Sequence, residues 1–450
     1  DDDPFPGMPP RHDNPIDLLR VPCIVQRIVV RGNTRTKRAL IDAELASAAS
    51  ATTHEQLALE LALAKDRLDQ LDIFKSAECS VDICSSPDAA DNALDVVLNV
   101  TEKGTHTIST GTYMQGGEGN AEVSWTVRNL LGNAERMQGN ASLGHNTSNS
   151  FRVEASVPMA FGSAPRFNLS AFQSNSNLAK YSSFRDRQRG MTMALTNMTD
   201  GESSHEVWYE GSWRTVALEK GSLVCPPEEA GDSFKSSLRH VYTYDTRDDP
   251  RMASSGVLMR NTLEVAGLGG DVKFVKNTLE GQQHIALPSF GIALAFSGSL
   301  GFLQSLGGQS SRINDRFFLG GPVVMRGFRT KGLGPRGSGK SSSSCAKGGD
   351  AFFTAGVTAT MDLPSRVLQA LNVKGHVFCN TGNNIAVGGG RPVWKQMPSM
   401  LSNYRAVLGM GMVVPLQVGR LEANYCLPLR VMPDLGDRLA RWQLALSFES

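Results

Sequence analysis

The pattern of apolar positions along the chain changes near residue 104. Before that point, short apolar runs typical of strands alternate with stretches in which apolar residues recur every three or four positions. Strands are predicted at 24–30, 79–83 and 94–100. Two helices are predicted between the first two strands, and the second begins after Thr53 with a shared apolar face of Leu57, Leu61, Ala64, Leu68 and Leu71. The order β-α-α-β-β within 22–103 is sufficient for one small domain.

From residue 105 onward, segments of roughly ten residues alternate between apolar and polar positions. Val123, Trp125 and Val127, for example, are separated by polar residues. This alternation fits a soluble β-sandwich, and it fits equally a membrane barrel whose apolar face meets lipid. About sixteen segments fit into 105–450, and that number favours the barrel. The predicted fold class is therefore an all-β transmembrane barrel of about sixteen antiparallel strands with one small N-terminal domain.

One stretch competes with this interpretation. Residues 285–311 carry no charge and suggest a transmembrane helix. Pro288 and five glycines weaken that suggestion, and Ile292, Leu294 and Phe296 alternate at the period of a strand. The pattern therefore favours strands here as well.

Composition narrows the class of protein further. Lys and Arg number 45 and Asp and Glu 44, so the net charge of +1 gives no reason to expect binding to nucleic acid. Hydrophobic residues make up 40% of the chain, which argues against a bundle of membrane-spanning helices. The seven cysteines cannot all pair within one chain. Residues 1–21 show no secretory or transit signal and are expected to form a flexible segment.

Two short motifs imitate functional sites. Residues 334–341 match the string of a phosphate-binding loop, but no apolar strand precedes them and no helix-forming sequence follows. His376 and Cys379 have the spacing of metal ligands, but in an alternating segment they face opposite sides. No catalytic motif accompanies them. We therefore expect no enzymatic activity, nucleotide, cofactor or metal.

The segment 314–336 has a different character. Its glycines and prolines prescribe a definite backbone path, and Arg326, Gly327 and Phe328 place a cation and an aromatic ring at a tight turn. The residues alone also fit a solvated basic loop. The strings Leu-Gly-Gly, Met-Arg-Gly-Phe and Gly-Leu-Gly-Pro-Arg closely resemble the sixth-loop signature of the POTRA-bearing outer-membrane barrel insertases.

The resemblance extends over almost the whole chain. Further signatures of that superfamily match residues 244–250 with 255–256, residues 348–352 and residues 129–133. The domain at 22–103 resembles a single POTRA domain, which is the pattern of the core barrel subunit of the mitochondrial sorting and assembly machinery. The family's F-x-D-x-G motif is altered here, because Asn380 replaces the aspartate.

The resemblance implies a barrel at 105–450 with a long inserted loop at about 305–350. It implies that the loop arginine is anchored to the barrel wall, with Asn380 and Glu422 as alternative partners. The implied loop anchor consists of Arg326, Gly327, Phe328, Asn380 and Glu422. The implied loop backbone residues are Gly320, Gly321, Gly332, Gly334, Pro335 and Arg336. A lateral gate between the first and last strands would include Thr105, Thr107, Ser109, Gly111, Trp442, Leu444, Leu446 and Phe448.

The function implied is insertion and folding of β-barrel precursor proteins in the mitochondrial outer membrane. The POTRA domain would lie in the intermembrane space, and the partners would be precursors, accessory assembly subunits and membrane lipid. Residues 94–100 are a candidate edge strand for receiving a precursor, although the same strand also fits an internal position. Two alternatives stay open: a polypeptide-translocating channel of the same superfamily, and a soluble β-protein or nucleotide-binding enzyme.

Overall fold

The structure is a computed structural model. It describes residues 21–84, 90, 92–115, 118–144, 148–158, 165–182, 184–200, 202–218, 229–250, 252–337, 345–387, 392–416 and 419–448. These residues form two compact units, of which the first takes in the chain up to His106 together with 127–136 and 157–163. The segment 1–21, expected to be flexible, lies outside the described residues except for Val21.

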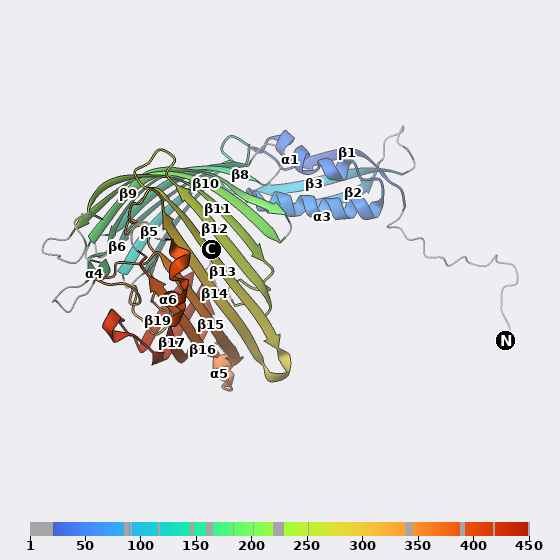
Figure 1. The fold of residues 1–450 in the computed structure, drawn as a ribbon. Helices are drawn as coiled ribbons and strands as arrows, with labels where there is room; N and C mark the ends of the chain where they lie inside the picture. The colour runs from blue at the N-terminus through green and yellow to red at the C-terminus, as the bar shows by residue number, and fades with distance from the viewer. Residues whose placement is uncertain are drawn as a thin grey trace, which may run out of the picture. The chain divides into compact units, whose positions relative to one another are not determined.

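The first unit contains a three-stranded sheet covered by helices (Figure 1). Its elements are β1 (Ile24–Arg31), α1 (Arg38–Glu44), α2 (Ala46–Ala49), α3 (His54–Gln70), β2 (Phe74–Ile83) and β3 (Ala93–Glu102). The predicted order of strands and helices is confirmed, with the first predicted helix divided into α1 and α2 at Leu45.

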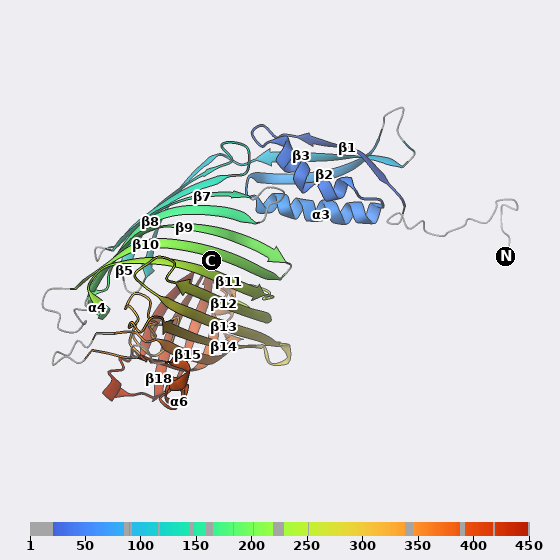
Figure 2. The same cartoon turned by 45° about the horizontal axis from the view of Figure 1, so that its top comes forward.

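Helix α3 begins where the sequence predicts. The Thr53 side chain accepts a hydrogen bond from the backbone N–H of Gln56, which satisfies one of the free donors of the first turn. Its buried face carries Leu57, Leu61, Ala64 and Leu68, which pack with residues of the sheet into one core. Figure 2 shows α3 lying along the sheet.

Strand β3 occupies the centre of this sheet. The strand order is β1-β3-β2, with β1 parallel and β2 antiparallel to β3. The interpretation of 94–100 as an edge strand is therefore wrong. The short connection between β2 and β3 predicts that these two strands pair along one edge of β3. The sequence does not show that β1, which is distant along the chain, pairs along the other edge.

The turn that joins β5 and β6 belongs to the first unit. The Asn129 side-chain amide donates to Thr36 Oγ1 at 2.8 Å, and the backbone N–H of Lys37 donates to the carbonyl of Gly132 at 2.9 Å. Ala134 is 1% exposed and forms part of the domain core. The first unit thus extends beyond 22–103 and includes a turn of the barrel sequence.

Glu102 at the end of β3 makes the stability of this unit depend on pH. Burial acts to raise the pKa of Glu102, but hydrogen bonds from Thr36, Thr34 and Arg35 outweigh it and lower the pKa from 4.5 to about 2. The ionised carboxylate therefore stabilises the folded unit above pH 4.5, and that contribution is lost as the pH falls towards about 2. The contribution is at most about 3 kcal/mol.

We expect proteolysis of the first unit in the intact chain to accelerate between about pH 5 and pH 3. Because Glu102→Gln removes the titrating group, this variant should be less stable at neutral pH and should show a smaller change over that interval. Pulse proteolysis by an acid-tolerant protease measures both quantities. An unchanged pH profile in Glu102→Gln would show that other carboxylates control the acid sensitivity.

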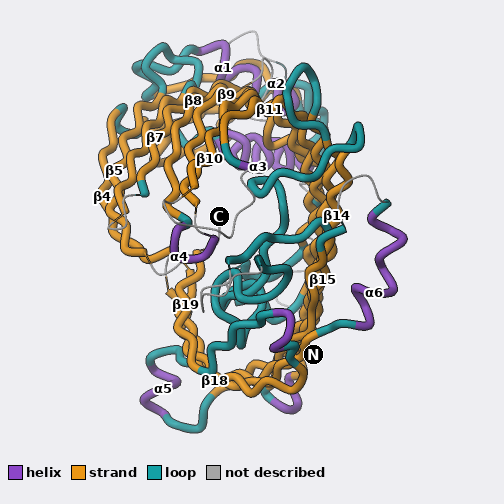
Figure 3. Tube along the Cα trace, turned by 60° about the vertical axis from the view of Figure 1, so that its left-hand side comes forward, coloured by secondary structure: helices purple, strands orange, loops and turns teal. Residues whose placement is uncertain are grey.

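The second unit is a sheet of 16 strands in the order β19 through β4. Its strands are β4 (His106–Gln115), β5 (Glu118–Arg128), β6 (Arg136–Gly144), β7 (Asn149–Pro158), β8 (Arg166–Asn177), β9 (Phe184–Asp200), β10 (Ser203–Leu218), β11 (Gly231–Asp245), β12 (Gly256–Ala266), β13 (Phe274–Leu287), β14 (Ile292–Ser305), β15 (Ala351–Asp362), β16 (Lys374–Ile385), β17 (Arg405–Leu416), β18 (Gly419–Arg430) and β19 (Trp442–Phe448). Short helices in the connections are α4 (Ala179–Ser182), η3 (Pro288–Phe290), α5 (Arg366–Ala370), η4 (Val393–Gln396), α6 (Met397–Ser402) and η5 (Pro433–Leu435). The predicted sixteen-stranded barrel fold is confirmed, and the strands curve around a set of loop segments (Figure 3).

The uncharged stretch 285–311 forms strands. β13 ends at Leu287, η3 makes the turn, and β14 returns beside β13 with Leu287 opposite Ile292. Gly291 has φ +62°, a conformation that glycine adopts readily at such a turn. No helix in the described part of the chain has both the length and the apolar character needed to cross a membrane.

Candidate functional site

The described parts of the long loop between β14 and β15, residues 306–337 and 345–350, lie inside the ring of strands (Figure 3). Two hydrogen bonds shape its turn: the N–H of Gly321 donates to the carbonyl of Phe328, and the N–H of Met325 donates to the carbonyl of Gly321. Gly327 has φ +90°, and a Cβ there would lie 2.7 Å from a methyl group of Val407. Only glycine therefore fits at this position.

The other loop residues named from the sequence lie along the same path. Gly320 has φ +108° and Gly334 φ +116°. The N–H of Gly332 donates to the carbonyl of Arg329, the carbonyl of Pro335 accepts from Lys347, and Arg336 Nη2 donates to the carbonyl of Lys331. These contacts are internal to the loop and hold its shape.

The Arg326 side chain reaches β18. Its Nε and Nη2 donate to the same oxygen, Glu422 Oε2, at 3.2 and 2.8 Å. The other oxygen of Glu422 lies 2.9 Å from Nε of Arg420. The Arg326 guanidinium carbon also lies 4.8 Å from the centre of the Phe378 ring. Arg326 and Glu422 side chains are only 15% and 6% exposed, so the pair is largely shielded from water.

Asn380, the alternative partner, makes no hydrogen bond with Arg326 in the described part of the chain. It is 8% exposed and lies on β16, opposite Gly356 of β15. A Cβ on Gly356 would lie 2.8 Å from Asn380 Oδ1. The substituted position therefore packs against the neighbouring strand, while Glu422 receives the arginine.

An apolar cluster fixes the loop to the inner wall beneath this ion pair. Its buried members are Leu319, Met325, Phe328, Leu333, Phe352, Phe378, Val407 and Cys426. Phe328 is fully buried, so the aromatic residue of the turn serves as an apolar anchor. The side of the strands that faces the loop is therefore partly apolar, whereas alternation alone predicts a polar lumen.

Gln443 connects the same turn to the last strand. Its Oε1 accepts from the N–H of Gly327 at 2.8 Å, and its Nε2 donates to the carbonyl of Phe328 at 2.7 Å. Next to it, the N–H of Ala440 donates to the carbonyl of Gly327 at 2.9 Å. A displacement of the turn would therefore break hydrogen bonds to β19 itself.

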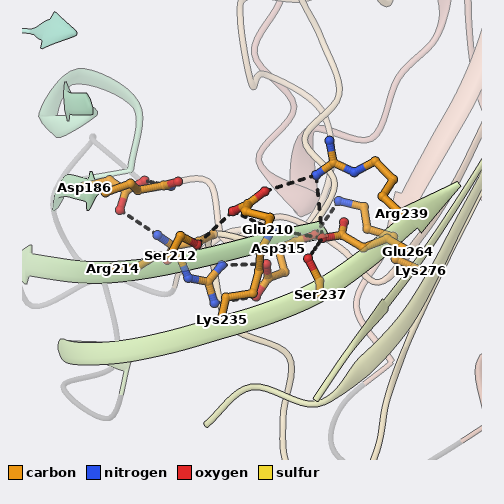
Figure 4. A network of polar contacts seen from close by, with 12 residues as sticks. Asp186, Glu210, Ser212, Arg214, Lys235, Ser237, Arg239, Glu264, Lys276 and Asp315 are labelled. Atoms are coloured by element: carbon orange, nitrogen blue, oxygen red, sulfur yellow. Dashed lines mark hydrogen bonds and ion pairs between the residues drawn. The ribbon is translucent and has the colours of Figure 1, made fainter. Parts of the chain in front are cut away.

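A second ion pair holds the start of the loop on the wall formed by β9 to β13 (Figure 4). Arg214 of β10 donates to both carboxylate oxygens of Asp315, at 2.7 and 3.2 Å. The two side chains are 3% and 5% exposed. Lys276 donates to the carbonyl of Asp315 at 2.8 Å, and Asn314 donates to Asp186 at 2.7 Å. The loop is thus held at two walls.

Charges on the neighbouring strands continue this network, of which Lys235 and Glu264 are buried (Figure 4). Lys235 lies 2.9 Å from Glu264 and 3.2 Å from Glu210, and Arg239 lies 3.6 Å from each of the same carboxylates. Two cations therefore compensate two anions, which limits the cost of burying them.

The expected gate strands are the two ends of the sheet. In the described residues β19 pairs only with β18, from Tyr425 opposite Trp442 to Gly419 opposite Phe448, and β4 is the last strand at the other end. Trp442 and Leu444 are 77% and 71% exposed. The side chains of Leu446 and Phe448 lie outside the described residues.

The residues named on β4 face away from those named on β19. Ser109 contacts Ser124, whose neighbours Val123 and Trp125 are exposed on the opposite face. Thr107 and Gly111 share the face of Ser109, and Thr105 precedes the strand. Pairing across the ends would therefore place Ser109 on the side of Gln443 and Ala445.

The two imitating motifs have no functional geometry in the described residues. Gly334 to Gly337 lie in the loop, and the rest of that string lies outside the described residues. His376 is 4% exposed and contacts Asn424, whereas Cys379 is exposed on the other face of β16. No group of three His, Cys, Asp or Glu residues in the described ranges is arranged to hold a metal ion.

Sequence reasoning missed three contacts: Arg214 with Asp315, Gln443 with the turn, and Arg405 with Asp437. The last pair is 1% exposed on both sides, with distances of 3.0 Å. The alternation places Arg214 and Gln443 on the polar faces of their strands. No sequence signal identifies their partners, which lie 101 residues from Arg214 and 116 residues from Gln443, or the partner of Arg405, which lies 32 residues away.

Comparison with known proteins gives the family. Residues 129–449 match the Omp85 superfamily domain. Sorting and assembly machinery component 50 homolog A of Xenopus laevis is 31% identical over 422 residues, covering 92% of this chain and 88% of the relative. The human homolog is 31% identical over 424 residues with the same coverage. A SAM50-like protein of Schizosaccharomyces pombe is 30% identical over 385 residues, covering 84% of this chain and 79% of the relative.

A solved structure shows the same fold. BamA from Haemophilus ducreyi lacking POTRA domains 1–3 superimposes with a TM-score of 0.75 at 18% identity, covering 94% of this chain and 84% of that one. At this identity the likeness concerns the fold. It includes both the sixteen-stranded barrel and the small domain before it.

Proposed function

Because the chain belongs to the Omp85 superfamily, we propose that it inserts and folds β-barrel precursor proteins in the mitochondrial outer membrane, pairing each incoming strand with β4 and β19. The names of its frog and human relatives, which are components of a sorting and assembly machinery, support assembly as the process. The proposed function is non-enzymatic, and its partners are precursors, lipid and the accessory subunits of the assembly machinery.

The observation that carries the proposal is the position of β19. A strand cannot enter hydrocarbon with unpaired backbone groups, so an inserting strand needs an existing edge. β19 has 7 residues, whereas its neighbour β18 has 12. Fewer backbone hydrogen bonds hold a short strand, and a short end strand therefore separates more readily. In β4, a Cβ on Gly111 would meet no atom within 4 Å, and such an unpacked glycine weakens a strand.

The interior supports insertion at the edge over transport through the lumen. The loop, the apolar cluster around Phe328 and the two buried ion pairs occupy the space along the inner wall. A translocating channel of the same superfamily would have to displace these contacts to admit an unfolded chain. Lateral insertion requires only that the two end strands separate.

We propose that the first unit, a POTRA-like domain, faces the intermembrane space and receives precursors. Its free edges are β1 and β2, because β3 is central. Ile83 and Val81 at the end of β2 are 80% and 43% exposed, which leaves apolar side chains beside an open edge. An extended precursor segment can add to such an edge by backbone hydrogen bonding.

A covalent lock across the end strands tests the proposal. In a chain without its seven native cysteines, cysteines at Ser109 and Ala445 face the same side of the sheet. We expect oxidation to join them and to reduce precursor insertion into vesicles by about tenfold or more, because a closed seam offers no edge. Reduction of the bond should restore insertion.

The matched control places cysteines at Tyr209 and Leu238, which lie opposite each other on β10 and β11. Oxidation of that pair should leave insertion unchanged. Complete crosslinking of the seam with undiminished insertion would exclude the lateral route. A precursor trapped by crosslinkers only inside the lumen would favour the channel.

A further inference from the structure

The outer face of β9 changes from apolar to basic along the strand. Met193 and Met191 are 49% and 58% exposed on this face. The next outward positions are Arg189, Arg187 and Arg185, all exposed. The intervening residues face the other way: Asp186 contacts the inserted loop. The three arginines therefore form a ladder about 13 Å long on the face that continues the lipid-facing methionines.

Aromatic neighbours mark the level at which this ladder begins. Arg189 lies opposite Trp213 of β10, and Trp213 contacts Phe234 of β11 with ring centres 5.5 Å apart. Trp213 is 47% exposed on the outer face. Tryptophan is enriched where the hydrocarbon of a membrane meets its head groups. Arg189 is thus at that boundary, and Arg187 and Arg185 lie beyond it at the level of lipid phosphates.

Within the described residues, no nearby carboxylate neutralises the positive charges of Arg187 and Arg189. In the described part of the chain neither Arg187 nor Arg189 forms an ion pair. Arg187 Nε donates to Asn175 Oδ1 at 3.0 Å, which fixes the guanidinium through an uncharged partner. Asp232 on the same level accepts a hydrogen bond from Thr215 instead.

Polar side chains surround the arginines with a preformed groove. Asn175 in turn donates to Asn149 at 2.6 Å, so the amides hold each other in place. The groove has a volume of about 420 Å³, and its lining includes Asn149, Asn175, Arg185, Arg187 and Thr215. Asp186 also lines it, but its carboxylate accepts hydrogen bonds from Gln188 and Asn314. Guanidinium and amide N–H groups are donors that bind phosphate oxygens.

We propose that Arg187 and Arg189 bind the phosphate groups of anionic phospholipids in the leaflet at this end of the barrel. The ladder continues a lipid-facing surface without interruption, so its occupant is a lipid head group whose acyl chains cover Met191 and Met193. This site lies on the outside of the barrel and is separate from the loop and the end strands.

The test compares bound lipids on the full-length protein. Purified protein in detergent receives equal amounts of phosphatidylglycerol and phosphatidylcholine, and native mass spectrometry measures the ratio of the two bound lipids. We expect the unmodified protein to prefer phosphatidylglycerol. The double variant Arg187→Gln/Arg189→Gln should lower that ratio by about 25-fold, because each basic residue near the surface contributes about a fivefold preference for anionic lipid.

Matched variants isolate the cause. Lys65→Gln/Lys75→Gln removes the same charge from exposed positions of the first unit and should leave the ratio unchanged. Arg187→Lys/Arg189→Lys keeps the charge and should retain most of the preference. An unaltered ratio in the glutamine variant would overturn the proposal. Displacement of phosphatidylglycerol by an acidic peptide such as polyglutamate, but not by inorganic phosphate, would also overturn it and assign the ladder to a protein partner.

Discussion

Replacing Arg326 by alanine is expected to reduce precursor insertion by about tenfold or more while the barrel stays folded. Breaking a fully buried ion pair costs roughly 3 to 5 kcal/mol. The cost here should be smaller, because Glu422 keeps Arg420 as a partner at 2.9 Å. The turn, however, loses a charged contact with β18, and its hydrogen bonds to Gln443 of β19 lose their support. Insertion should therefore suffer more than thermal stability.

The measurement pairs the insertion rate in vesicles with the heat-induced unfolding of the same preparation. Arg326→Lys should restore little, because one ammonium group cannot reproduce the contacts of Nε and Nη2. Glu422→Gln should reproduce part of the defect, and the double variant should add little to Arg326→Ala. Arg329→Ala is the control, because Arg329 is an exposed arginine of the same turn. Normal insertion by Arg326→Ala would remove any functional role from the pair.

Replacing Asp315 by asparagine should lower the free energy of unfolding of the barrel by about 3 kcal/mol or more. The variant leaves Arg214, whose side chain is 3% exposed, without its carboxylate. The half-buried Lys276, which donates to the backbone carbonyl of Asp315, also loses a neighbouring negative charge. The loss should appear as a lower midpoint of urea unfolding in vesicles.

Removing both charges distinguishes the pair from its individual members. Arg214→Met/Asp315→Leu should be more stable than Asp315→Asn, because apolar residues leave no buried charge uncompensated. The control is Asp362→Asn, which removes a 67% exposed carboxylate 3.9 Å from Lys374 and should cost less than about 1 kcal/mol. Equal effects of Asp315→Asn and Asp362→Asn would show that the buried pair contributes little.

Much of the architecture can be predicted from local patterns. Alternation predicts the strands of the barrel, and it places Glu422 on the polar face of β18. On that face Glu422 accepts the hydrogen bonds of Arg326. The helical spacing after Thr53 predicts α3 with its cap. These features depend on neighbouring residues, so the sequence contains the information directly.

The features that could not be predicted depend on distant pairing. The central position of β3 follows from its parallel contact with β1, which lies some seventy residues earlier. Arg326 pairs with Glu422 and not with Asn380 because the turn that carries it approaches β18, and the sequence does not show which strand the turn approaches. Strand β2 begins five residues before the predicted start, because Phe74 and Ser76 pair with β3 through a register shift. Periodicity contains no information on such contacts.

The contacts of the turn at 129–135 have a consequence for the order of folding. Ala134 fills part of the core of the first unit, and Asn129 binds Thr36, which precedes it by 93 residues. Closing a chain segment of that length carries an entropic cost that must be met before the contacts form. The small domain can therefore collapse early around α3, but its packing is complete only when the hairpin of β5 and β6 has formed. A chain released after residue 106 would keep an unfilled place in its core, and the hairpin of β5 and β6 would close it.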